Sequence, residues 1–301
     1  MKKIFLFFLF AIILQNIGFG QNAKSTVGKV RHFEKFPSIY VQARHVDVWL
    51  PADYDSTQKY AVLYMHDGQM LYDSTSTWNH QEWQIDEAMT KLLQDKKIRN
   101  TIVVGIWNNG AFRHSEYFPQ KAIKYIPKNI ADSLNKINFQ GKAQADNYLR
   151  FLTKELKPFI DKTFSTYTDK DNTFIAGSSM GGLISFYAIC EYPKIFGAAA
   201  CISTHWIGDV KQKNDFIPQA FQKYFAKNMP SPKKHRLYFD YGTVALDSLY
   251  KRHQIEMDKI LQAKGYTENN CTSKEFVGED HSEKSWAKRI QIPLVFLLRK
   301  D

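Results

Sequence analysis

The feature that most constrains the fold is a short glycine-rich turn between an apolar strand and a helix. Residues 174–176 (FIA) predict a buried strand, and residues 177–182 (GSSMGG) open the helix that follows. The turn of a G-x-S-x-G sequence in this setting is so tight that the positions flanking Ser179 tolerate little beyond glycine. The pattern therefore predicts that Ser179 lies at the carboxyl end of a strand and at the N-terminus of a helix, with its hydroxyl exposed.

Strands and helices alternate along most of the chain. Short apolar runs predict strands buried on both faces, and they lie at residues 60–65, 101–107, 172–176, 198–203 and 236–240. Helical spacing of apolar residues follows these runs, at residues 83–93, 148–160, 179–192, 246–263 and 285–298. An antiparallel entry at 24–58 and a short last strand at 275–277 complete the pattern. The sequence thus predicts an α/β fold with a mostly parallel central sheet and helices on both faces.

The first twenty residues predict a secretory signal peptide. Lys2 and Lys3 precede an apolar run, and small residues follow near Gly20. The alternative is an uncleaved anchor, but the run is shorter than the roughly 20 apolar residues that span a bilayer. We expect cleavage near Gly20 or Ala23, no stable membrane insertion afterwards, and a periplasmic or secreted protein. Residues 21–301 then predict one domain, with irregular insertions near 108–140 and 205–232 as candidate lids over the site.

Charge and cysteine content limit the kinds of binding partner and cofactor that are expected. The formal net charge is +11, and about +9 remains once Lys2 and Lys3 are removed. No basic run is interleaved with aromatics, so nucleic acid is not an expected partner. A solvated basic surface is favoured over attraction to anionic glycans or envelope material. Three cysteines match no zinc pattern and leave pairing open, and no motif requires a metal or an organic cofactor. Oligomeric state is not predicted.

A serine nucleophile needs a general base, and His281 stands where the α/β-hydrolase order requires one. It lies in a polar loop after the last short strand and before the last helix, which preserves the order serine, acid, histidine. His253 falls within a predicted helix, and His235 stands beside two lysines. His205 follows a strand end, and we expect it to line the site without acting as the base.

The acid that orients the histidine should follow the strand at 236–240. Asp240 still belongs to that strand, whereas Asp247 lies beyond the turn at 241–243. The loop position favours Asp247, and Asp240 is the alternative. The oxyanion of the tetrahedral intermediate needs backbone N–H donors. Met180, next to the nucleophile, supplies one, and Gln69, directly after the strand at 60–65, is the best candidate for the other.

Six side chains near the predicted mouth are considered as candidate substrate contacts. Trp78 and Trp107 have the aromatic surface to stack on a sugar or an aromatic acyl group, as does Trp83. Packing of the loops is an equal alternative for these tryptophans. Arg113, together with Glu116, is another candidate, and for both a structural ion pair is at least as favoured. His205 completes the set.

These motifs together resemble the esterase D-like "putative esterase" family, which includes enterochelin esterase-like proteins, carbohydrate esterase family one and the mycolyltransferases. The similarity covers nearly the whole mature chain. It rests on residues 48–51 (VWLP), 63–69 (LYMHDGQ), 83–87 (WQIDE), 103–106 (VVGI) with Asn108, Arg113 with 116–117 (EY), 177–182 (GSSMGG), 242–243 (GT) and 278–283 (GEDHSE) with Trp286. The resemblance implies a triad of Ser179, Asp247 and His281, with the acid least secure because its spacing from Gly242 varies in the family.

The expected activity is carboxylic ester hydrolysis through an acyl-enzyme, on a small-molecule or polysaccharide ester. Export and the aromatics near the mouth favour acetyl or feruloyl esters of polysaccharide. A siderophore ester is the alternative substrate, and transfer of the acyl group to another sugar is an alternative reaction. A degenerate hydrolase that only binds glycans is the non-enzyme alternative, which the intact set of serine, acid and histidine disfavours.

Overall fold

One eight-stranded sheet forms the centre of the computed structural model, which describes residues 24–211 and 214–300. Its spatial order is β1-β2-β4-β3-β5-β6-β7-β8. The strands are β1 Lys29–Phe36, β2 Arg44–Leu50, β3 Ala61–His66, β4 Thr101–Ile106, β5 Thr173–Ser178, β6 Ala198–Ile202, β7 Arg236–Gly242 and β8 Cys271–Phe276. Strands β3 to β8 pair in parallel with one another, whereas β1 pairs antiparallel with β2 and β2 pairs antiparallel with β4. The predicted mostly parallel sheet with an antiparallel entry is confirmed.

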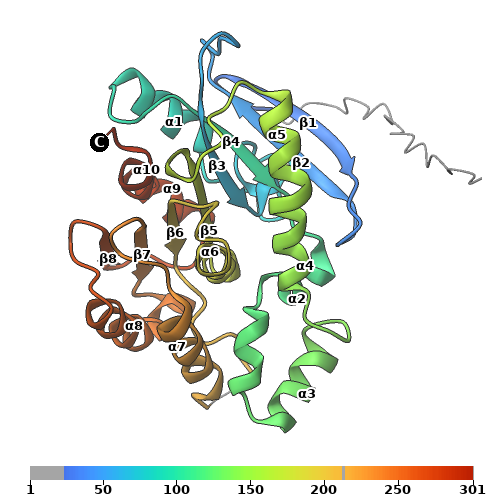
Figure 1. The fold of residues 1–301 in the computed structure, drawn as a ribbon, viewed down its shortest axis with the longest axis vertical. Coiled ribbons are helices and arrows are strands. Elements are labelled where there is room, and N and C mark those ends of the chain that lie inside the picture. The colour runs from blue at the N-terminus through green and yellow to red at the C-terminus, as the bar shows by residue number, and fades with distance from the viewer. Residues whose placement is uncertain (1–23, 212–213, 301) are drawn as a thin grey trace, which may run out of the picture.

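Helices cover both faces of this sheet (Figure 1). They are α1 Ile85–Gln94, α2 Arg113–Tyr117, α3 Lys128–Ile137, α4 Ala145–Arg150, α5 Lys157–Thr163, α6 Met180–Glu191, α7 Phe216–Asn228, α8 Lys251–Ala263, α9 Glu283–Arg289 and α10 Gln291–Leu298. Figure 1 shows α1, α9 and α10 gathered on one side of the sheet and the long α4–α5 helix on the other. The predicted signal peptide at 1–20 lies outside the described residues.

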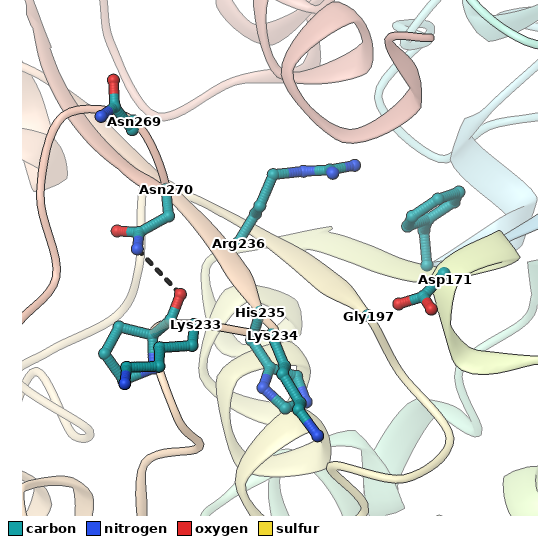
Figure 2. Close-up of a pocket in the computed structure, with 10 residues that line it drawn as sticks. Asp171, Gly197, Lys233, Lys234, His235, Arg236, Asn269 and Asn270 are labelled. Atoms are coloured by element: carbon teal, nitrogen blue, oxygen red, sulfur yellow. Dashed lines mark hydrogen bonds between the residues drawn. The ribbon is translucent and has the colours of Figure 1, made fainter. Parts of the chain in front are cut away.

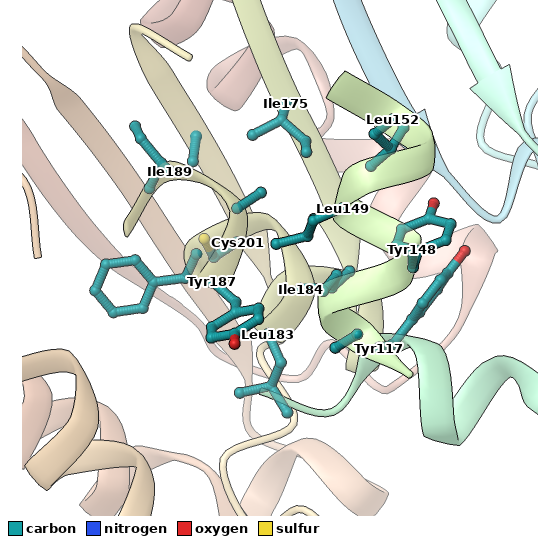
Figure 3. Close-up of a cluster of buried hydrophobic side chains, with 14 of the residues drawn as sticks. Tyr117, Tyr148, Leu149, Leu152, Ile175, Leu183, Ile184, Tyr187, Ile189 and Cys201 are labelled. Carbon is teal, nitrogen blue, oxygen red and sulfur yellow. The ribbon is translucent and has the colours of Figure 1, made fainter. Parts of the chain in front are cut away.

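Alternation along the strands divides the apolar side chains between two cores. In β3, Val62 and Tyr64 belong to the core under α4 to α8, whereas Leu63 and Met65 belong to the core under α1, α9 and α10. Successive side chains of a strand point to opposite faces, so a strand covered on both faces must be apolar throughout. Figure 3 shows part of the larger core, with Leu149 and Leu152 pointing toward α6 and β5. The continuous apolar run at 60–65 has its cause in this double coverage.

A widened helical turn joins α4 to α5. Residues Phe151–Leu156 form a π-helical turn directly before Pro158. Proline has no N–H to donate, and its ring clashes with the carbonyl four residues earlier, so a regular α-helical ladder cannot continue through it. One continuous helical segment at 148–160 was predicted from apolar spacing, and the structure keeps it continuous through this turn.

The two segments expected to be irregular contain helices. Residues 108–140 include α2 and α3, and the expectation for 205–232 is wrong over Phe216–Asn228, which form α7. Pro218 is part of this helix. It occupies the first turn of α7, where a missing N–H costs nothing because those N–H groups have no partner within the helix.

The described residues contain neither a membrane-spanning helix nor a disulfide. Across 24–211 and 214–300, no helix has both the length and the hydropathy needed to cross a bilayer. Cys190, Cys201 and Cys271 all lie in this part of the chain, and all three are free thiols. The first two are buried, which raises the pKa of each thiol well above its usual value and keeps it protonated.

A buried ion pair fixes α2 against β2. Both guanidinium Nη atoms of Arg44 donate to the Glu116 carboxylate, each at 2.7 Å. The two side chains are only 1% and 2% exposed, and the Arg44 guanidinium lies over the rings of Tyr148 and Phe151. Removing one charge would leave the other buried without compensation.

We expect Glu116→Gln to lower the free energy of unfolding by about 3 kcal/mol, because Arg44 loses its counter-charge in a buried site. Denaturant unfolding measured by circular dichroism tests this. The control is Asp132→Asn, the same carboxylate-to-amide change in an exposed pair with Lys128, where less than about 0.5 kcal/mol is expected. An equal loss of unfolding free energy in the two variants would show that the buried pair stabilises the fold no more than an exposed pair does.

Candidate active site

The turn at Ser179 is backbone-strained and closely packed. Ser179 joins β5 to α6 with φ 58° and ψ −122°, a conformation that residues with a side chain rarely adopt. A Cβ on Gly177 would lie 2.9 Å from the Gly181 carbonyl, and one on Gly181 would lie 3.3 Å from His66. Close approach therefore requires glycine at Gly177 and leaves little room for a side chain at Gly181. The turn places Ser179 at the carboxyl end of β5, only 8% exposed, with its N–H bonded to the Ile202 carbonyl at 2.9 Å.

His281 lies in the loop between β8 and α9, as predicted from chain order. Its Nδ1 is 2.6 Å from Oδ1 of Asp247. The imidazole is held edge-on between two aromatic rings, with centroids 5.1 Å from Trp286 and 5.8 Å from Tyr250. Its side chain is 16% exposed, so one edge of the ring reaches the surface while the acid behind it does not.

Asp247 is fully buried and accepts hydrogen bonds on both oxygens. Besides His281 on Oδ1, its Oδ2 accepts from the Ser203 hydroxyl at 2.5 Å and from the Gly242 N–H at 2.6 Å. Burial acts to raise the pKa of Asp247, but these hydrogen bonds and the His281 ring outweigh it and lower the pKa below its usual value. A Cβ on Gly242 would lie 2.1 Å from the Glu279 carbonyl oxygen, so only glycine brings this N–H so close.

Among the described residues, no hydrogen bond joins Asp240, the alternative acid, to His281. It accepts from the Ser203 N–H at 3.1 Å, from the Tyr238 hydroxyl at 3.0 Å and from Arg289 at 3.1 Å. Burial raises the pKa of Asp240, with Arg289 opposing the shift. The geometry thus pairs His281 with Asp247, and leaves Asp240 to brace the residues behind it.

Ser203 links the two carboxylates and was not identified from the sequence. Its hydroxyl donates to Asp247 and accepts from Trp286 Nε1 at 3.0 Å and from Arg289 Nη2 at 2.9 Å. Its backbone has φ 41°, and the residue is fully buried. The only local signal was its place at the end of a predicted strand.

The backbone N–H groups of Met180 and Gln69, the predicted oxyanion donors, lie in turns at helix starts. Met180 is the first residue of α6 and Gln69 lies in a short 3₁₀ turn over Gly68–Met70, so neither N–H has a carbonyl partner within its own helix. Asp67 enters this turn in the left-handed conformation, at φ 58°. A Cβ on Gly68 would lie 2.5 Å from the backbone of Gly105, so glycine is needed where the turn crosses β4.

Arg113 holds this turn through a two-pronged ion pair. Its Nε and Nη2 donate to the two oxygens of Asp67 at 2.8 and 2.7 Å, and the Asn108 side chain donates to the same carboxylate at 2.8 Å. Burial would raise the pKa of Asp67, but Arg113 and Asn108 lower it. The structural ion-pair interpretation therefore fits Arg113, and Glu116 pairs separately with Arg44. A contact of Arg113 with substrate stays a prediction.

The candidate tryptophans have different surroundings. Trp78 is 83% exposed, whereas Trp83 is buried and its ring packs 5.1 Å from that of Trp286. Trp107 is half-buried, donates its Nε1–H to Asp47 at 2.5 Å and lies 4.8 Å from the His45 ring. Packing therefore accounts for Trp83. For Trp78 and Trp107 a substrate contact stays a prediction.

His205 lies behind Ser179 and is buried. Its backbone N–H donates to the Ser179 backbone carbonyl at 3.2 Å, and its ring Nδ1 is 2.7 Å from the Tyr250 hydroxyl. Burial lowers the pKa of His205 well below its usual value, and the neighbouring His281, His114 and Arg113 act in the same direction. The ring is therefore neutral. Tyr250, its partner, was not identified from the sequence.

Two surface hollows lie at opposite edges of the sheet. Figure 2 shows one at the amino ends of β7 and β8, bordered by Lys233, Lys234 and Arg236. Ser179, Asp247 and His281 do not line it. The other, of about 660 Å³, lies between the segment after β6 and the start of α8 and is lined by Ile207, Val210, Asn214, Asp215, Pro218, Ser248, Leu249, Lys251, Arg252 and Ile255. The second hollow shares the carboxyl edge with Ser179, because both of its walls follow the carboxyl ends of β6 and β7.

Comparison with known proteins gives consistent matches. Residues 39–291 match the family described as "Putative esterase". Protein YbbA of Bacillus subtilis (strain 168) is 23% identical over 264 residues, which cover 86% of this chain and 94% of that protein. An endo-1,4-beta-xylanase/feruloyl esterase of Xylanibacter ruminicola is 29% identical over 159 residues, covering 50% of this chain but only 18% of that protein.

Solved structures share the fold at low identity. A ferulic acid esterase superposes with a TM-score of 0.63 at 19% identity, covering 90% of this chain and 98% of that one. The enterobactin esterase of Shigella flexneri gives a TM-score of 0.63 at 16% identity, covering 92% of this chain and 60% of that one. At these identities the likeness concerns the fold.

The two buried aspartates should differ in what their loss does. We expect Asp247→Asn to lower kcat for an activated ester by at least about a thousandfold, because the amide cannot balance a charged imidazole and favours the wrong tautomer. Asp240→Asn should lower the melting temperature but change kcat by less than about tenfold, because it disturbs Arg289 and not His281. Steady-state kinetics and thermal unfolding of both variants test this. A larger kcat loss for Asp240→Asn would contradict the pairing.

Proposed function

This chain belongs to the family described as "Putative esterase", and we propose that it hydrolyses carboxylic esters with Ser179, His281 and Asp247 as its catalytic triad. The observation that carries the proposal is the contact of 2.6 Å between His281 and a buried, multiply hydrogen-bonded Asp247, beside a serine in a strained turn. Such a turn exposes a hydroxyl for attack, and such a pair makes a neutral imidazole a base.

Acylation follows from these positions. His281 takes the proton of Ser179 through Nε2 as Oγ attacks the ester carbonyl. Asp247 holds Nδ1–H toward itself and stabilises the charged imidazole. The N–H groups of Gln69 and Met180 donate to the oxyanion, and the positive end of α6 adds to this stabilisation. His281 then protonates the leaving alkoxide.

Deacylation repeats the sequence with water as the nucleophile. His281 removes a proton from water, which attacks the acyl carbon, and the same two N–H groups bind the oxyanion again. The bond from the acyl carbon to Oγ breaks, and His281 returns a proton to Ser179. The free acid leaves and the enzyme is restored.

Acetyl or feruloyl esters of polysaccharide are the substrates that we propose. Supporting features are the exposed Trp78 and the apolar side chains of the second hollow, with Val210 and Leu249 61% and 50% exposed. Exposed aromatic and aliphatic surface suits sugar rings and aromatic acyl groups. Lys251 and Arg252 border the same hollow, where they pair with Glu275 and Asp215, and their basic side chains make an anionic ester such as a catecholate siderophore the second candidate. Such substrates are met outside the cytoplasm, in keeping with the proposed export of residues 21–301 as one domain.

We expect Ser179→Ala to keep less than about a hundredth of the wild-type kcat, because removing the nucleophile of a triad costs far more than that. The variant should keep the wild-type circular dichroism spectrum. A fluorophosphonate probe should label the wild type and not the variant. Labelling of neither protein, together with no turnover, would favour the glycan-binding alternative.

Purified mature protein tested on p-nitrophenyl acetate, methyl ferulate, acetylated xylan and a catecholate siderophore ester separates the substrate candidates. We expect a higher kcat/KM on acetylated xylan or methyl ferulate than on the siderophore ester. Lys251→Ala/Arg252→Ala is the matched variant, because loss of both cations should weaken only an anionic substrate. Preference for the siderophore ester that this double variant abolishes would replace the polysaccharide proposal.

A further inference from the structure

Tyr250 is a buried tyrosine at the centre of the site, and the mechanism above gives it no role. It lies directly before α8 and is fully buried. Its ring meets two histidine rings edge-on, with centroids 5.8 Å from His205 and 5.8 Å from His281. The ring therefore fills the space between the proposed base and the imidazole behind the nucleophile.

The Tyr250 hydroxyl has two polar neighbours. His205 Nδ1 is 2.7 Å away, and the Ser179 side chain is close enough to the hydroxyl to act on the pKa of Tyr250. Desolvation by burial raises the pKa of Tyr250 well above its usual value, so its hydroxyl keeps its proton. The partner imidazole is neutral and carries one N–H, because burial, reinforced by the nearby Arg113, opposes its protonation.

Only one arrangement of these protons leaves Ser179 ready to react. If His205 Nδ1–H donates to the Tyr250 oxygen, the Tyr250 O–H is free to donate to Ser179 Oγ, and the serine proton remains for His281. If instead Tyr250 donates to Nδ1, its oxygen accepts the serine proton, which then points away from the base. The first arrangement is the one compatible with attack by Ser179.

We propose that Tyr250 is a further catalytic residue, whose hydroxyl donates a hydrogen bond to Ser179 Oγ when that oxygen leaves the acyl-enzyme. The inference rests on the proposed function. When the second tetrahedral intermediate collapses, the bond between the acyl carbon and Oγ breaks and its electron pair stays on Oγ. His281 transfers its proton to Oγ, and Tyr250 keeps its own proton throughout.

The effect differs between the two half-reactions. A donor aimed at Oγ stabilises the negative charge that gathers there as the oxygen leaves, which favours deacylation. In acylation the same oxygen attacks and loses electron density, so the same donor gives no advantage. Tyr250 should therefore accelerate the second half-reaction selectively, which a purely structural tyrosine would not do.

Tyr250→Phe tests this with p-nitrophenyl acetate in a stopped-flow instrument. We expect kcat to fall about tenfold, the value of one neutral hydrogen bond, and KM to fall with it. The ratio kcat/KM, which reports acylation, should stay within about threefold of wild type. A burst of nitrophenol equal to the enzyme concentration should appear, because the acyl-enzyme accumulates.

Tyr266→Phe is the matched control. Its hydroxyl is also buried and donates to the Pro230 carbonyl at 3.1 Å, beyond the end of α8. It should change neither kcat nor the burst. His205→Gln keeps an N–H donor toward Tyr250 and should lose less kcat than His205→Leu, which should reproduce the burst of Tyr250→Phe.

The proposal is overturned if Tyr250→Phe keeps the wild-type kcat, or if kcat and kcat/KM fall by the same factor without a burst. Should Tyr250→Phe fail to fold, His205→Leu decides in the same way through its own kcat and kcat/KM. Failure of the underlying function looks different, because wild-type Ser179 would then not be labelled by the fluorophosphonate probe.

Discussion

The tight turn between β5 and α6 is the constraint on which the rest of the site depends. Ser179 adopts a positive φ, a Cβ on Gly177 would collide with the Gly181 backbone, and a Cβ on Gly181 would have little room. Strain of this kind persists only where the surroundings fix it. Here β5 and α6 are buried along nearly all of their length, and the Ser179 N–H is bonded to Ile202 of the next strand. Packing of the whole core thus holds one hydroxyl in place.

The parallel register aligns the ends of neighbouring strands with the position of Ser179. Ser178 pairs with Ile202, and Ile202 pairs with Asp240, so the strand ends of β5, β6 and β7 lie at one level. Ser179 and Ser203 follow these paired residues directly. The segment beyond β7 then returns over the edge, and Gly242 brings its N–H to Asp247. Ser179 and the His281–Asp247 pair lie at the same edge of the sheet because adjacent parallel strands end together.

Sequence reasoning identified what is local and missed what depends on packing. Ser179 and His281 could be found because a motif and the chain order specify them. Asp247 and Asp240 could not be separated with certainty, because both follow one strand and only the turn at Gly242 directs Asp247 inward. Ser203 and Tyr250 carry no pattern of their own. Their roles arise from contacts with residues as distant along the chain as Arg289 and His205. Helix α7 lies within the segment that was expected to be irregular and was not predicted.

The two buried aspartates explain how one small region supports both chemistry and structure. Both are fully buried beside Arg289, yet the pKa of Asp240 is raised and that of Asp247 is lowered. Desolvation acts on both, so the difference comes from the hydrogen bonds that each accepts. Asp247 has the histidine, Ser203 and Gly242, which keep it ionised and able to stabilise an imidazolium. Where two carboxylates have pKa values driven apart by their surroundings, their roles separate too. Asp240 and Arg289 form an ion pair behind the site. Ser203 is hydrogen-bonded to both of them and to Asp247, so it links this pair to Asp247.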